Sequence, residues 1–182
     1  MPLSYGGGIT NLSEIEKILK LGVEKIVINS SIHTNLKFIS EACERFGSST
    51  IVASIDYKKN LWGKNLVYIN NGTDKTNYAP FELAKRLEEI GVGEIMINSI
   101  ERDGTMQGMD LEFWEECVNG LSTPIIGAGG VGSIKDLKVA IEKTNIAAIA
   151  VGSLFVYYGS NHSVLINYPS QIEILALNTH SK

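Results

Sequence analysis

The chain has 182 residues, of which 44% are hydrophobic and 20% are charged, and its formal net charge is −4. This composition is ordinary for one globular domain, and the negative charge disfavours sequence-blind binding to nucleic acid, which requires a basic face. No apolar stretch approaches the roughly 20 residues of a membrane span, and Cys43 and Cys117 are predicted to be buried free thiols. We therefore expect a cytoplasmic protein that binds neither membrane nor nucleic acid.

Short apolar runs alternate with helical patterns six times along the chain. Runs such as 26–28 and 125–126 are continuously apolar, as parallel strands covered on both faces are. The alternation favours an α/β fold, either a (β/α) barrel or a doubly wound sheet. The expected strands cover 3–5, 25–29, 50–56, 94–99, 124–127 and 147–151. The first expected helix is capped by Asn11 or Ser13 and runs to about residue 21. The other expected helices cover 36–46, 80–90, 110–119 and 133–143.

Two stretches depart from this alternation. Residues 57–78 contain apolar positions that alternate around a Gly turn, which predicts a β-hairpin excursion. Residues 163–182 form a C-terminal tail whose final polar residues we expect to fray. Both belong to one expected domain, 1–182.

Two glycine turns, Gly6-Gly7-Gly8 and Gly129-Gly130, each follow a strand and precede a helix, at an offset of 122 residues (130 − 8). Consecutive glycines let backbone N–H groups approach an anion, and the N-terminus of the next helix adds partial positive charge. After each turn the same apolar positions recur, and the next strand ends in Asn29-Ser30 or Gly152-Ser153. This duplication favours the barrel and predicts two facing phosphate sites for a ligand with a phosphate at each end.

An eight-unit barrel usually needs about 250 residues, whereas the sequence supplies six units. The chain opens on a strand that already leads into a ligand turn, so we expect the two missing units to belong at the front. The predicted fold class is an incomplete (β/α)8 barrel with about six units.

Polar residues at strand ends are the candidates for chemistry. Asp56 ends the apolar run 51–55, so its carboxylate should project at the C-terminal mouth and could act as an acid or base; an N-cap or a surface salt bridge is the alternative. Asn98 and Ser99, at the end of the run 94–99, can donate hydrogen bonds into the same mouth. In the polar loop that follows, Asp103 and Gly104 could form only a turn.

Lys25 and Glu94 begin their strands and should lie at the opposite floor, either as an ion pair on the barrel axis or as solvated strand ends. His33, His162 and His180 lack metal-ligand spacing, so we expect no metal and no cofactor.

Five segments together resemble one family. They are Tyr5–Ile9, Val27–Ser30, Ala53–Lys58, Glu94–Thr105 and Gly129-Gly130. The chain is similar to the cyclase subunit of imidazole glycerol phosphate synthase, a histidine-biosynthesis barrel, and within that family to divergent paralogues found with bacterial surface-polysaccharide genes. The resemblance implies a lyase that receives ammonia from a separate glutaminase subunit in a heterodimer. It closes an imidazole ring on a bisphosphorylated ribulosyl-formimino aminoimidazole carboxamide ribotide.

The resemblance also implies roles for individual residues. Asp56 matches one of two acid/base aspartates, and Asp103 matches a carboxylate of the mouth. Lys25 and Glu94 match two members of a charged gate for ammonia. Gly8 and Asn29 match one phosphate site, and Gly104, Gly130 and Ser153 match the other. Gly152 and Asn98, at the ends of their strands, are further candidates for binding the substrate.

The chain departs from the family at Asn98, where Thr is usual, and at Ala128, where Ser is usual. The other catalytic Asp belongs to the first strand of the family's barrel, which the sequence lacks, and we therefore expect this chain alone to be inactive. Two other interpretations stay open. One is the sister isomerase that rearranges the formimino ribotide, and the other is an impaired barrel that still docks a glutaminase. The histidine pathway and a surface-polysaccharide pathway are not distinguished.

Overall fold

A curled parallel sheet forms the centre of the protein. The structure, a computed structural model, describes residues 2–158, 163–166 and 168–178. Six strands pair in parallel, each with the next along this path: β1 (Ser4–Gly6), β2 (Lys25–Ile28), β3 (Ile51–Lys59), β6 (Glu94–Ser99), β7 (Ile125–Ala128) and β8 (Ala148–Ala150). Within the described residues, β1 and β8 are the two ends of this path and do not pair with each other.

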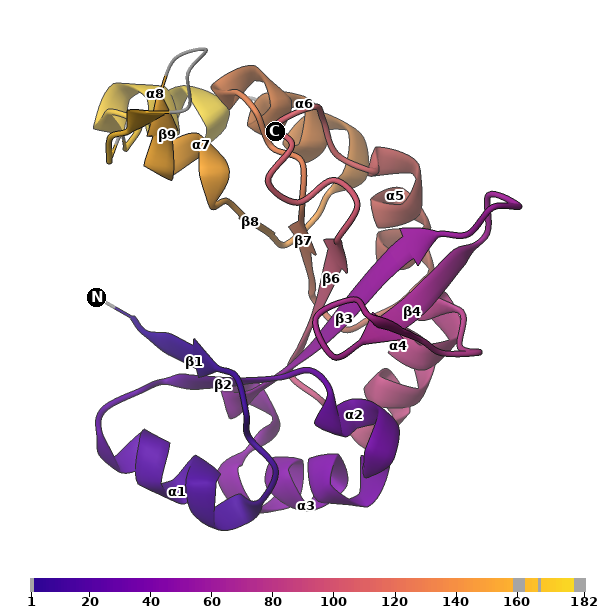
Figure 1. The fold of residues 1–182 in the computed structure, drawn as a ribbon. Helices are drawn as coiled ribbons and strands as arrows, with labels where there is room; N and C mark the ends of the chain where they lie inside the picture. Colours follow the sequence, from indigo (N-terminus) through magenta and orange to yellow (C-terminus); the bar gives the residue numbers. More distant parts are fainter. Residues whose placement is uncertain (1, 159–162, 167, 179–182) are drawn as a thin grey trace.

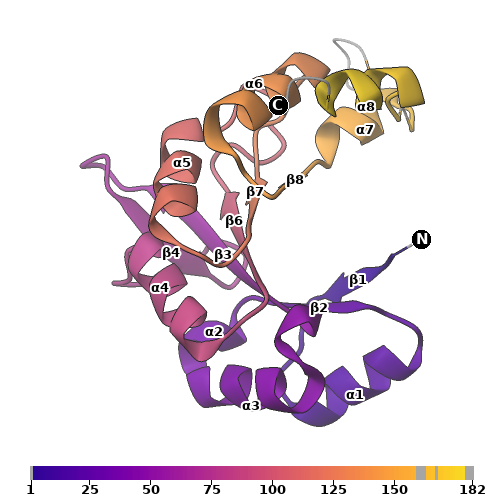
Figure 2. The same cartoon turned by 180° about the vertical axis from the view of Figure 1, so that it is seen from behind.

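The major helices cover the outer, convex side of the sheet (Figures 1 and 2). They are α1 (Leu12–Lys20), α3 (Leu36–Phe46), α4 (Pro80–Ile90), α5 (Leu111–Gly120) and α6 (Ile134–Thr144), with short helices α2 (Ser31–Thr34) and α7 (Ser153–Val156) after β2 and β8. A strand, an outer helix and the next parallel strand recur around the curve, as in a (β/α)8 barrel. The predicted fold class, a partial barrel, is confirmed.

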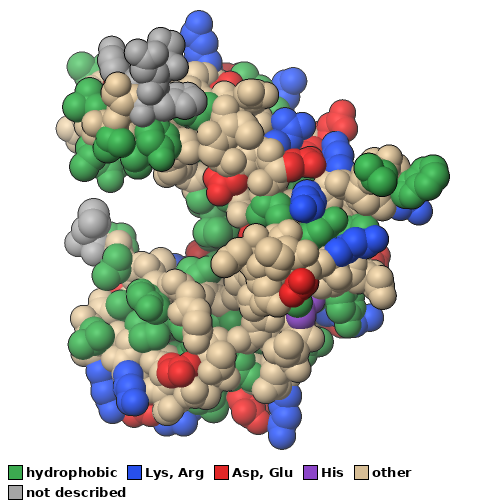
Figure 3. All heavy atoms as spheres, in the orientation of Figure 1, with side chains coloured by type: hydrophobic (Ala, Val, Ile, Leu, Met, Phe, Trp, Pro, Cys, Tyr) green, Lys and Arg blue, Asp and Glu red, His purple; other side chains and the backbone are tan. Residues whose placement is uncertain are grey.

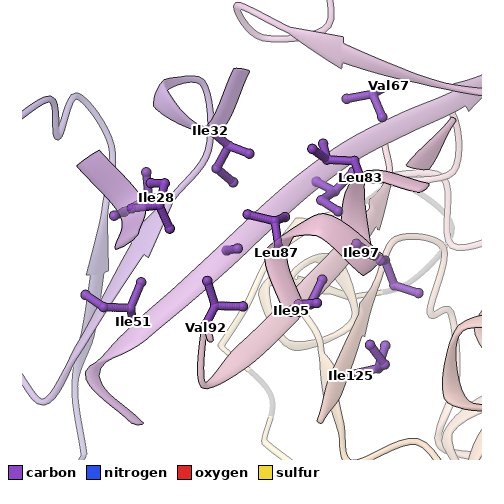
Figure 4. Packing of buried hydrophobic residues seen from close by; sticks show 14 of the residues in the cluster. Ile28, Ile32, Ile51, Val67, Leu83, Leu87, Val92, Ile95, Ile97 and Ile125 are labelled. Carbon is purple, nitrogen blue, oxygen red and sulfur yellow. The ribbon is translucent and has the colours of Figure 1, made fainter. Parts of the chain in front are cut away.

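The core lies between the sheet and its helices. Side chains alternate along each strand, and those facing the helices, such as Ile26, Ile55 and Ile97, are buried. Figure 4 shows Ile28 of β2 beside Ile51, the first residue of β3, and Ile95, Ile97 and Ile125 of β6 and β7 on the other side of the view, with Leu83 and Leu87 of α4 between them. The opposite side chains of β2, β3 and β6 face the barrel interior and stay partly exposed, except for the buried Val52 in β3.

The two halves of the duplication begin their helices in the same way. At α1, the Asn11 side chain accepts a hydrogen bond from the Glu14 backbone N–H, and the Glu14 carboxylate accepts one from the Asn11 backbone N–H. At α6, Ser133 and Asp136 make the same two bonds. Both capping residues and both acidic partners are 122 residues apart. The reciprocal cap satisfies two free N–H groups at each helix start, so the internal repeat extends to specific hydrogen bonds.

Several expected elements differ from the observed ones. β3 runs on to Lys59 because it pairs with the antiparallel strand β4 (Asn65–Ile69), which pairs in turn with β5 (Asp74–Lys75). Helix α2 was not predicted. The tail contains β10 (Ser163–Val164), paired with β9 (Tyr157–Tyr158), and α8 (Gln171–Asn178). His162, His180 and the residues expected to fray, 179–182, lie outside the described residues.

Candidate functional site

One layer of interior side chains lies at the carboxyl end of the sheet. Strand register pairs Asp56 with Asn98, Asn98 with Ala128, and Ala128 with Ala150. Asp56 faces the interior because its neighbours Ile55 and Tyr57 face the helices, where the Tyr57 ring lies 4.7 Å from that of Phe113 in α5. The side chains of this layer therefore meet at the mouth of the barrel.

Asp56 is the half-buried carboxylate of this layer. Its Oδ1 accepts a hydrogen bond of 3.0 Å from Nδ2 of Asn98. Burial raises the pKa of Asp56 above its usual value; the amides of Asn98 and Asn29 oppose this shift, and the nearby Asp103 carboxylate adds to it. The environment favours a carboxyl group that can both hold and release a proton.

A small polar pocket follows the ends of β6, β7 and β8. Its lining consists of Asp103, Gly104, Gly129, Gly130, Val131, Ala150, Gly152 and Ser153. The loop after β6 is fixed across it: the Gly108 N–H donates to the Gly130 carbonyl at 2.8 Å, and Nη1 of Arg102 donates to the Gly108 carbonyl at 3.1 Å. Five residues predicted for one phosphate site or the mouth, on three loops, thus lie together.

The glycines of this second turn are required by packing. A Cβ on Gly129 would lie 2.6 Å from the Ser99 carbonyl oxygen, and one on Gly130 would lie 2.1 Å from that of Gly108. Both residues also have positive φ, at +98° and +91°. Their absent side chains let the loop after β6 approach the turn closely, so anion binding is not their only explanation.

The first turn is more open than its counterpart. Gly8 has a φ of +70°, but a Cβ there would meet nothing within 4 Å. Oγ of Ser31 donates to the Ile9 carbonyl at 2.7 Å, which ties the start of α2 to this turn. Asn29, just past β2, donates from Nδ2 to the Ser54 carbonyl at 3.1 Å. Gly8 and Asn29 therefore follow neighbouring strands at the same end of the sheet as Asp56.

The floor of the barrel carries an ion pair. Nζ of Lys25 lies 2.8 Å from Oε1 of Glu94, and the side chains are 34% and 26% exposed. The same ammonium donates to the Ser49 carbonyl at 3.3 Å. Of the two alternatives for these residues, the structure has the ion pair and not solvated strand ends.

A buried polar contact was missed by the sequence reasoning. Tyr57 donates from its hydroxyl to Oδ2 of Asp110 at 3.4 Å, and Nζ of Lys59 lies 4.0 Å from the same oxygen. Burial, with the Asp110 carboxylate, raises the pKa of Tyr57 far above its usual value. The contact joins β3 to the residue before α5. The alternation along β3, which turns Tyr57 toward the helices, was the available signal.

Most of the chain matches one protein family. The profile described as "Histidine biosynthesis protein" matches residues 1–162. The chain belongs to that family. The similarity to the cyclase subunit, inferred from five short segments, is thereby confirmed, since the relatives carry that enzyme's name.

Individual members of the family are closely similar. A Pseudomonas aeruginosa protein, provisionally named imidazole glycerol phosphate synthase subunit hisF2, is 46% identical over 169 residues, which are 93% of this chain and 67% of the relative. A Leptospira interrogans protein, provisionally named subunit HisF of the same synthase, is 46% identical over 178 residues, or 97% and 70%. The subunit HisF of Bacillus cereus is 39% identical over 157 residues, or 86% and 62%. The chain spans about two thirds of the length of these family members.

The described residues contain neither a membrane-spanning helix nor a cluster of metal ligands. No helix among them is long and apolar enough to cross a membrane. No group of three or more His, Cys, Asp or Glu side chains in that part of the chain is placed to hold a metal ion.

Proposed function

We propose that the protein is the cyclase subunit of an imidazole glycerol phosphate synthase. It would use ammonia to convert the bisphosphorylated formimino ribotide into imidazole glycerol phosphate and aminoimidazole carboxamide ribotide. The observation that carries the proposal is the half-buried Asp56, whose raised pKa and contact with Asn98 lie at the mouth of a family barrel. A proton-transferring carboxyl group suits ring closure, which moves protons between nitrogen, oxygen and carbon atoms.

The ligand would be held at both ends. Gly104, Gly130, Gly152 and Ser153 line one polar pocket, and their backbone N–H groups and the Ser153 hydroxyl would hold a phosphate there. Gly8 and Asn29, at the ends of β1 and β2, would hold the second phosphate. Asn98 and Asp103 would contact the part of the ligand between them.

Ammonia would enter from the floor, where Lys25 and Glu94 pair. The proposed partner is a glutaminase subunit docked there in a heterodimer, and the proposed location is the cytoplasm. The names of the relatives support the partner, because each describes one subunit of a synthase.

The test is isothermal titration of the intact protein with the bisphosphorylated ribulosyl ribotide, with its ribosyl isomer as the control ligand. We expect saturable one-to-one binding that is tighter for the ribulosyl form. No saturable binding of either ligand would contradict the proposal, and tighter binding of the ribosyl isomer would favour the sister isomerase.

A second function, docking of a glutaminase without turnover, is favoured by one observation. The floor ion pair is formed even though β1 and β8 do not pair with each other in the described part of the chain. Co-elution with a glutaminase, together with no binding of the ribotide, would support this alternative.

A further inference from the structure

The mouth has an excess of negative charge for a site that would bind a bisphosphate. Asp56 and Asp103 both contribute carboxylates, and the pocket at the second glycine turn is lined by Asp103 and by no lysine or arginine among the described residues. Backbone amides can direct hydrogen bonds at phosphate, but they carry only partial charges. Arg102 lies against Gly130, but its Nη1 donates to the Gly108 carbonyl, so a bound bisphosphate would gain from a further cationic group at the mouth.

Lys58 is placed to supply that group. It follows Asp56 by two residues on β3, so both side chains lie on the face turned toward the barrel interior. Among the described residues it makes no ion pair, and its side chain is partly buried. Its neighbour Lys59 points the other way, toward Asp110. A partly buried ammonium without a counter-charge is costly to remove from water.

The hairpin holds this ammonium in place. Nζ of Lys58 lies 4.2 Å from the centroid of the Tyr68 ring in β4, and Tyr68 is the residue paired with Asp56. The same nitrogen is 3.5 Å from the Gly72 carbonyl oxygen. A cation over an aromatic face is attracted by the ring without being neutralised. The contacts orient Lys58 and leave its positive charge available.

The turn that carries the Gly72 carbonyl is strained. Asn70, Asn71 and Gly72 have successive φ angles of +51°, +57° and +78°. Left-handed conformations in successive non-glycine residues are uncommon and concentrate at functional sites. This turn packs against the loop after β6, because a Cβ on Gly72 would lie 2.7 Å from Cδ1 of Ile100. The left-handed turn, which connects β4 to β5, is therefore fixed against the loop that follows β6.

We infer that Lys58 is a binding residue for an anionic group of the ligand, most directly a phosphate oxygen. It would supply at the mouth the positive charge that the two glycine turns lack. The inference rests on the proposed function in taking a phosphorylated ligand at this mouth. It goes beyond that function in assigning a side chain from the hairpin to the ligand.

The test is titration of the intact protein with inorganic pyrophosphate, followed by the NMR shifts of the Lys58 and Gly72 backbone amides. We expect Lys58→Met to weaken binding roughly ten- to a hundredfold, the range for losing a hydrogen bond to a charged group. Lys58→Arg keeps the charge and should retain most of the binding. Lys64→Met, an exposed lysine of the same hairpin, should bind like the wild type.

Unfolding midpoints of all four proteins show whether Lys58→Met remains folded, and Lys58→Arg gives a second measurement if it does not. The inference is overturned if Lys58→Met binds pyrophosphate like the wild type, if Lys58→Arg loses binding as fully as Met, or if the wild type does not bind pyrophosphate. If pyrophosphate binds in a way that depends on Lys58 but the ribotide does not bind, the role of Lys58 in anion binding is supported and the proposed function is contradicted.

Discussion

At the scale of single residues, Asp56 is where the environment most changes chemistry. Burial is the main cause of its raised pKa, and the Asn98 amide, by donating to Oδ1, favours the ionised form. These opposed effects keep both protonation states accessible, as an acid/base group needs. The hydrogen bond that Asn98 Nδ2 donates to Asp56 therefore helps to set how tightly the carboxyl group holds its proton.

Replacing Asp56 tests its chemical role. In any preparation that catalyses ring closure with ammonium, Asp56→Asn should lower kcat by about 10²–10⁴-fold, the usual range for general acid/base groups, with little change in ribotide affinity. The measurement is release of aminoimidazole carboxamide ribotide. Glu44→Gln, at an exposed carboxylate of α3, is the control. Full turnover by the Asn variant would exclude Asp56 from proton transfer.

The same carboxyl group predicts a dependence of stability on pH. Because its folded pKa lies above the ordinary value of 3.8, the folded state holds the proton more tightly than the unfolded chain. Its stabilising contribution is complete below that ordinary value and is lost as pH rises through the folded pKa. Urea unfolding of the wild type and of Asp56→Asn measures this effect across the pH range. As pH rises, the unfolding free energy of the wild type should fall relative to that of Asp56→Asn. A difference that stays constant with pH would contradict the raised pKa.

At the scale of elements, the two halves of the repeat share their helix caps but not the packing of their turns. Gly130 lies beneath the loop after β6, whereas Gly8 has open space beside it. The sequence predicted the turns because glycine spacing and helix periodicity are local. It could not predict their different packing, because that depends on where the loop 101–108 folds.

This pair of glycines gives a matched substitution. Gly8→Ala should cost about 1–2 kcal/mol from positive φ alone. Gly130→Ala should cost roughly 1–3 kcal/mol more, because its Cβ would overlap the Gly108 carbonyl. Urea unfolding of both variants measures the difference. Equal losses would show that the loop does not press on the second turn.

Most of the regular elements could be predicted from sequence, and the exceptions have physical reasons. Helices α3 and α4 were predicted with their observed bounds, because Gly47 and Gly91 end them and Pro80 begins α4. Helix α2 is a single turn, too short for a periodic pattern to show. The end of β3 was missed because its last residues, from Asp56 on, pair with β4. The predicted hairpin began only after Asp56, so the strand was expected to end there. The roles of the predicted site residues remain proposals; their positions at strand ends followed from the parallel topology.

At the scale of the whole molecule, the path of parallel strands ends in an unpaired edge on each side within the part of the chain that the structure describes. β1 and β8 each pair on one side within the described residues, and the space-filling view is indented between the parts of the molecule that carry them (Figure 3). Leu3 and Tyr5 beside the first edge are 53% and 48% exposed. A cavity of about 710 Å³ along β8 has apolar lining from Ile146, Ile149 and Phe155. Such edges and apolar surfaces favour association with further strands.

A preparation of these 182 residues alone should therefore self-associate and should not catalyse ring closure. Sedimentation velocity should show species larger than the monomer, and Tyr5→Lys, which places a charge on the edge strand, should reduce them. Leu61→Lys, at a fully exposed apolar residue of the hairpin tip, should not. A stable monomer with turnover would contradict this expectation.

The most direct test of the account is a titration of isotope-labelled protein with the bisphosphorylated ribotide, in which the backbone amide signals of Gly8 and Gly130 are followed together. We predict that both signals shift and that one dissociation constant fits the two curves, because one ligand would join the two turns. A shift at only one glycine, or two unrelated dissociation constants, would contradict a ligand held at both ends across the mouth that contains Asp56.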